Sequence, residues 1–294
     1  MTQEKNSLLN HKYLNGWKLL GLVSLVISLI VIIPFMEIDA SNPAHISVMI
    51  ATSVRTAVPW LFLAFAASSL VHLFPNSLTK WIMRNRKIFG LCFATGMAWQ
   101  LFFIVWFVIG SFDYYMEEAY AFHSLVEQLP GYLILIAMTI TSFRLARKKM
   151  SGKNWRLLHK GGMYLLWGIL FSTYWYELFY YTDIQPIDHI YYWMGFGAWL
   201  SRIGSWTKKR RTAKQFKLPS GEFTAVSVPK LAISAILVII GMFMVINGQL
   251  WAPQTLDILN TIALGEWIEH FISFVPMIPL SIAFITFSKR QHIN

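Results

Sequence analysis

The residue with the clearest chemical potential is His159, in the segment WRLLHK at residues 155–160. There a basic polar stretch enters a long apolar run. A histidine at the membrane entrance of a helix can serve as an axial ligand of haem iron. The alternative role is interfacial, with the ring donating a hydrogen bond to a loop carbonyl or a lipid phosphate. Met97 and Met163 are possible thioether donors, although methionines at helical spacing usually fill cores.

Other metal-ligating residues are scattered. Cys92 is the one cysteine and lies within an apolar run, so we expect neither a disulfide nor a cysteine metal site. Four histidines lie near the predicted outer ends of apolar runs, but they come from separate loops and have no ligand spacing. We therefore predict no metal site from them. These are His45, His123, His189 and His270.

The elements that must position His159 are apolar and long. The chain has 294 residues, of which 56% are hydrophobic and 13% charged. About 20 apolar residues suffice to cross a bilayer core, and each such run must be a helix because lipid offers the backbone no hydrogen bonds. We predict an all-α, polytopic membrane helix bundle with about eight transmembrane helices. The runs are residues 17–35, 48–73, 87–110, 129–146, 158–180, 186–204, 229–247 and 266–287.

The basic residues support this number of spans. If the N-terminus is cytoplasmic and the spans alternate, every basic residue except Arg55 falls on the inner side, as expected from the preference of Lys and Arg for cytoplasmic loops. The prediction is an integral, multi-pass protein, of a bacterial inner membrane, with both termini cytoplasmic. Its segments are an N-terminal tail (1–16), a six-helix core (17–204), a basic loop (205–228), two further helices (229–287) and a C-terminal tail (288–294).

The net charge of +11 is concentrated in the predicted cytoplasmic segments. Basic residues beside a membrane attract anionic lipids by about 1 kcal/mol each. We therefore expect the loop 205–228 to contact anionic lipids of the bilayer, and we expect no nucleic-acid partner. A protein-docking surface is the alternative role for this loop.

Arg55 is predicted to lie about two turns inside the second span. An unpaired charge at that depth is costly, so an acidic partner is expected. Glu177, near the outer end of the fifth run, is the preferred partner, and Glu37 and Asp39 are alternatives. The Arg55–Glu177 pair would be structural or would form a proton or anion site.

Two further stretches of sequence form a recognisable pattern together with WRLLHK. RNRKIFGL at residues 84–91 places basic residues before a Gly-Leu entry to the third run. ITSFRLARKKMSGKNWRLLHKGGMYL at residues 140–165 joins Thr-Ser, a basic loop, the His159 segment and a downstream tyrosine. Residues 53–176 thereby resemble the ferric reductase-like transmembrane domain, most closely the haem-binding membrane subunit of the methionine sulfoxide reductase system.

This resemblance implies stacked b-type haems held by histidines of the third and fifth helices. The corresponding positions in this chain are residues 100, 159 and 172, of which only His159 is a histidine. Gln100 and Ser172 occupy the other two, and they would face each other across the deeper haem space. Amides and hydroxyls are not competent axial ligands in ordinary cytochrome b chemistry.

The chain has no GxGxxG motif after a strand and no P-loop, so we expect no flavin or NAD(P) site. Two functions remain. In one, the protein is a non-catalytic or partner-dependent membrane subunit that keeps a degenerate ligand set. In the other, it is a cytochrome b-like electron carrier with one haem at His159, or a quinone, and a separate protein donor. Whether the chain is an enzyme stays open.

Overall fold

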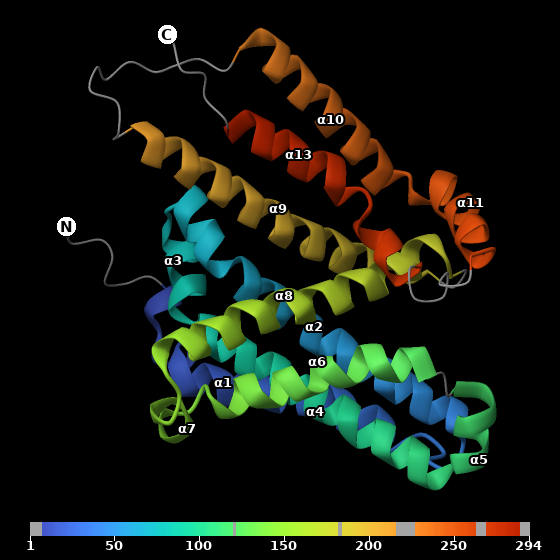
Figure 1. Ribbon diagram of the computed structural model, residues 1–294. Helices are drawn as coiled ribbons and strands as arrows, with labels where there is room; N and C mark the ends of the chain where they lie inside the picture. The colour runs from blue at the N-terminus through green and yellow to red at the C-terminus, as the bar shows by residue number, and fades with distance from the viewer. Residues whose placement is uncertain (1–7, 120–121, 182–183, 216–226, 263–268, 289–294) are drawn as a thin grey trace. The chain divides into compact units, whose positions relative to one another are not determined.

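The computed structural model describes residues 8–119, 122–181, 184–215, 227–262 and 269–288 (Figure 1). All regular structure in these residues is helical, which confirms the all-α prediction. The longer helices are α1 (Gly16–Phe35), α2 (Pro43–Leu73), α3 (Ser77–Arg84), α4 (Arg86–Gly110), α6 (Phe122–Ile140), α8 (Gly152–Phe179), α9 (Pro186–Gln215), α10 (Val228–Ile246), α11 (Gly248–Asn260) and α13 (Met277–Ser288). The short ones are η1 (Leu8–Asn10), η2 (Lys12–Leu14), α5 (Phe112–Tyr114), η3 (Tyr115–Ala119), α7 (Arg144–Lys148) and η4 (Glu269–Phe274).

Five helical segments in the described part of the chain are long and apolar enough to cross a membrane. They are α1, α2, α4, α10 and residues Phe271–Ser288. The other three predicted runs are helical too, as α6, α8 and α9. The apolar part of α6 is confined to Gln128–Ile140, and α8 and α9 carry charged residues near their ends. These segments fit an integral membrane protein.

Helix boundaries differ from the prediction at several places. Helices α2, α6 and α8 begin at Pro43, Phe122 and Gly152, before the predicted starts at residues 48, 129 and 158. Helix α9 continues to Gln215, eleven residues into the predicted basic loop 205–228, because lysine, arginine and alanine all favour helix. The predicted outer connection before the eighth run contains α11. The eighth run itself is divided into η4 and α13, while residues 266–268 lie outside the described residues.

The chain forms two compact units. The first comprises residues 1–67 and 76–170, and the second comprises residues 68–75 and 171–294. The division falls inside two continuous helices. The last residues of α2 and the last third of α8 therefore belong to the second unit.

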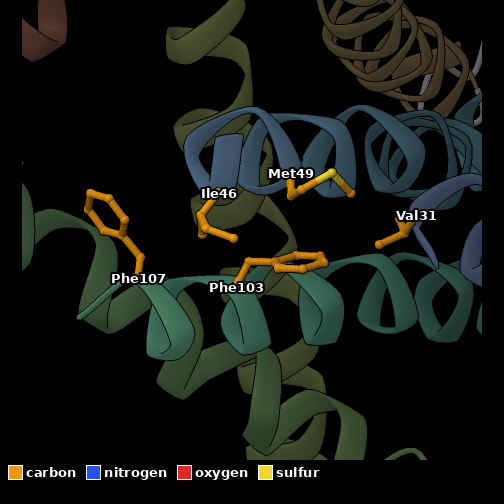
Figure 2. Packing of buried hydrophobic residues seen from close by; sticks show 5 residues of the cluster. All are labelled: Val31, Ile46, Met49, Phe103 and Phe107. Carbon is orange, nitrogen blue, oxygen red and sulfur yellow. The ribbon is translucent and has the colours of Figure 1, made fainter. Parts of the chain in front are cut away.

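The core of the first unit joins α1, α2 and α4 (Figure 2). Phe103 of α4 is fully buried and lies among apolar side chains of the other two helices. The cluster comprises Val31, Ile46, Met49, Phe103 and Phe107. In a bilayer such contacts stabilise the helices by packing, because lipid tails are as apolar as the side chains they replace.

A close approach and hydrogen bonds fix α4 against its neighbours. A Cβ on Gly96 would lie 2.7 Å from the Ala57 Cβ and 3.1 Å from its Cα, so this contact with α2 requires glycine. On the side of α1, the Trp99 indole donates to the Ser28 hydroxyl at 3.0 Å. The Ser24 hydroxyl lies 3.1 Å from that of Thr95 in the same interface. Polar side chains of α1 and α4 thus pair with each other, as polar groups between membrane helices do.

In the second unit, α13 packs against both α10 and α9 (Figure 1). Gly241 of α10 permits the contact, since a Cβ there would lie 2.5 Å from the Leu280 Cγ. The buried Tyr192 of α9 donates to the Val245 carbonyl at 2.9 Å. This bond satisfies the tyrosine hydroxyl inside the unit.

Candidate functional site

His159 lies in the second turn of α8, and its Nε2 is 3.1 Å from the hydroxyl of Thr141, which directly follows α6. That hydroxyl also lies 2.7 Å from the Ala137 carbonyl, to which it donates. The Thr141 hydroxyl and the His159 Nε2 are thus hydrogen-bonding partners, whichever of the two carries the shared proton. The ring nitrogen that faces Thr141 is therefore engaged with a protein side chain.

Trp155 also contributes to the contact between α8 and Thr141 at the end of α6. Its ring lies against that of His159, with centroids 4.3 Å apart, and its Nε1 donates to the Thr141 carbonyl at 3.2 Å. The i and i+4 residues of WRLLHK thus both bind the end of α6. The Arg147 guanidinium covers the ring of Trp155 at 4.8 Å. The conspicuous segment at the helix entrance is therefore a site of helix–loop packing.

The charges around His159 are positive. Arg86, at the start of α4, and Arg147 both act electrostatically on the imidazole. The Arg86 Nε donates to the Ala64 carbonyl of α2 at 3.1 Å. Neither guanidinium can ligate iron, because arginine offers donors and no acceptor.

Gln100 is half-buried on α4 and binds a tyrosine of α6. The Tyr132 hydroxyl donates to its Oε1 at 2.6 Å. Ser172 lies on α8 in the second unit, where it accepts a hydrogen bond from the buried Ser273 hydroxyl at 3.1 Å. Each position expected to hold a ligand is thus engaged within its own unit. The expected meeting of Gln100 with Ser172 joins the two units and stays a prediction.

Arg55 and Glu177 are both half-buried. Arg55 belongs to the first unit and Glu177 to the second, so their pairing also stays a prediction. Pro59, which lies inside α2, has no N–H and therefore leaves the Arg55 carbonyl without its helical donor. The pattern of helical backbone hydrogen bonds in α2 is thus interrupted at the residue that carries the charged side chain.

Among the described residues, no group of three or more His, Cys, Asp or Glu side chains is arranged to hold a metal ion. The His45 Nδ1 lies 3.3 Å from the Asp39 carbonyl. Hydrogen bonds from the hydroxyl and amide of Ser41 hold the pKa of the Asp39 carboxyl below its ordinary value. The side chains of His123 and His270 lie outside the described residues.

Two site residues were not assigned a role from sequence, namely Thr141 and Tyr132. Each carries a hydroxyl in or beside an apolar helix, which is a signal that a polar partner is needed there. The identity of the partner depends on how α6 packs against α4 and α8. No family model, curated protein or solved structure matches the chain, so these comparisons supply no relative.

Proposed function

We propose that this chain is a non-catalytic, partner-dependent subunit of a bacterial inner membrane, built on a ferric reductase-like helical scaffold whose haem ligands have been replaced. In this proposal it crosses the membrane eight times, with both termini cytoplasmic. The five long apolar helices support the membrane location. The distribution of basic residues supports the three remaining crossings and the orientation.

The observation that carries the proposal is the hydrogen bonding of the three ligand positions. The His159 Nε2 is hydrogen-bonded with the Thr141 hydroxyl, the Gln100 Oε1 accepts from a tyrosine, and Ser172 accepts from a serine. An iron ligand needs a free lone pair directed at the metal, and only imidazole among these groups is a usual donor to haem. The residues present therefore do not fit a bis-histidine haem.

Without a redox group of its own, the chain could take part in redox chemistry only together with another protein. The chain contains no dinucleotide or phosphate-loop motif. We infer that it supports a separate membrane or redox protein. Its spans would then form a docking surface within the bilayer, in place of an electron path through the protein.

The test is a reduced-minus-oxidised visible spectrum, with pyridine haemochrome quantification, of detergent-purified protein expressed with excess haem. We expect less than one-tenth of a haem per chain in a preparation that elutes as a single species and unfolds cooperatively on heating. A stoichiometric b-type band that disappears in His159→Ala would refute the proposal. It would favour a cytochrome b-like electron carrier.

A second arm tests the scaffold itself. The double variant Gln100→His, Ser172→His restores both missing imidazoles. Residues 100 and 172 belong to α4 and α8, which correspond to the third and fifth predicted spans. If these two helices keep the ferric reductase-like arrangement, this variant gains b-type absorbance that the wild type lacks. The matched control is Gln100→His alone, which supplies one new ligand without its partner.

A further inference from the structure

Two arginine side chains converge over Gly152. Gly152 is the first residue of α8 and follows α7 closely in the chain (Figure 1). A Cβ built on Gly152 would lie 3.9 Å from Nη2 of Arg147 and 3.9 Å from Nη1 of Arg156. Both distances start at one point, so the two nitrogens are at most twice that distance apart. No side chain of residue 152 occupies the space between the guanidinium groups.

Arg147 is held in this position by its neighbours. Its guanidinium stacks on the ring of Trp155 at 4.8 Å, and its Nη1 donates to the Met150 carbonyl at 2.9 Å. Its other terminal nitrogen, Nη2, is the one near Gly152. A guanidinium fixed by stacking loses little conformational freedom when it binds a ligand.

The charged side chains of this stretch of chain are all basic. Residues 144–160 contain seven lysines and arginines, and residues 128–176 contain no aspartate or glutamate. No carboxylate of this stretch of chain can therefore neutralise the two arginines. Two guanidinium groups at this separation are suited to an anion with several oxygens, since each forms charge-assisted hydrogen bonds of about 2.7–2.9 Å to a phosphate.

Exposed apolar side chains near the two arginines favour a lipid as the source of that phosphate. Leu145 of α7 is 83% exposed, and Leu157, next to Arg156, is 71% exposed. A soluble anion gains nothing from exposed leucines, whereas an acyl chain buries them. We propose that Arg147 and Arg156 bind the phosphate of an anionic phospholipid headgroup over Gly152. Leu145 and Leu157 contact the lipid tails.

The test is a binding titration of the full-length protein in neutral detergent, with three probes. These are short-chain phosphatidylglycerol, short-chain phosphatidylcholine and inorganic phosphate. We expect phosphatidylglycerol to bind at least tenfold more tightly than either of the others. The double variant Arg147→Gln, Arg156→Gln should lose this preference. Lys148→Gln, Lys149→Gln, which removes the same charge from the same loop, should keep it.

A carboxylate placed between the arginines tests the geometry while keeping both arginine side chains. Gly152→Asp should abolish the preference while leaving the thermal unfolding temperature equal to or above that of wild type. Gly152→Ala should retain it, because its Cβ makes ordinary contacts at 3.9 Å.

Three outcomes would overturn the proposal. The first is equal binding of both phospholipids to the wild type. The second is an unchanged preference in the arginine double variant. The third is inorganic phosphate that binds as tightly as phosphatidylglycerol and displaces it, which would indicate a site for soluble anions. Each of these outcomes is independent of whether haem binds at His159.

Discussion

The hydrogen bond between Thr141 and His159 is the contact whose removal is most informative. Thr141→Val keeps the shape of the side chain and removes only the hydroxyl. It leaves the Trp155 bond to the Thr141 carbonyl in place, because that bond uses the backbone. The half-buried His159 Nε2 then has no threonine partner.

The magnitude follows from burial. A fully buried donor left without a partner costs about 1–3 kcal/mol. His159 is only half-buried, so water reaches part of its ring, and hydrogen bonds between membrane helices average about 0.6 kcal/mol. We therefore expect Thr141→Val to lower the free energy of unfolding by about 1 kcal/mol.

The assay is reversible unfolding in mixed micelles of a neutral detergent and sodium dodecyl sulfate. A double-mutant cycle with His159→Phe, which keeps an aromatic ring beside Trp155, isolates the pair. The expected coupling energy is about 0.5–1 kcal/mol. Thr56→Val is the control, since the Thr56 hydroxyl donates to the Ser53 carbonyl of its own helix at 2.8 Å. A coupling energy of zero would show that the two side chains do not bind each other.

Two further changes test the packing of α4. Tyr132→Phe removes the donor to Gln100 and should destabilise the protein by about 0.6 kcal/mol in the same assay, while Gln100→Leu in the Tyr132→Phe background should cost little more. Gly96→Val places a side chain against Ala57 and should lower stability by about 1–3 kcal/mol. Gly90→Val, which meets nothing within 4 Å, should cost less than 1 kcal/mol, and similar losses for the two valines would contradict the close approach.

The helices that sequence predicted well are those whose apolar runs end abruptly. α4 spans Arg86–Gly110 against a prediction of 87–110, and α10 spans Val228–Ile246 against 229–247. α11 was not predicted because Gly248–Asn260 mixes proline, glutamine and tryptophan with apolar residues and has neither the length nor the apolarity of a span. The extension of α9 was not predicted, because its lysines and arginines fit two interpretations equally well. They are typical of a cytoplasmic loop, and they also favour the continuation of a helix.

The site was predictable only in part. The residue types placed His159 at the end of an apolar run, and in the structure it belongs to α8, which begins at Gly152. Its partner could not be read from the sequence, because Thr141 lies eighteen residues earlier and reaches the ring only through the packing of α6 beside α8. The same is true of Gln100, whose partner Tyr132 lies thirty-two residues later on another helix. Sequence thus identifies which polar groups need partners, and tertiary packing decides which partners they find.

The three positions that would hold iron in the ferric reductase-like arrangement share one property, which is a hydroxyl partner on a neighbouring element. The pairs are His159 with Thr141, Gln100 with Tyr132, and Ser172 with Ser273. A polar group that is partly shielded from water is stabilised by a hydrogen-bonding partner within the protein. A chain that replaces an iron ligand therefore needs a new hydrogen-bonding partner at the same depth. Hydroxyl side chains supply one without adding a charge. If the paired hydroxyls compensate for lost ligands, restoring histidine at residues 100 and 172 should cost stability in the absence of haem, and bound haem should recover it.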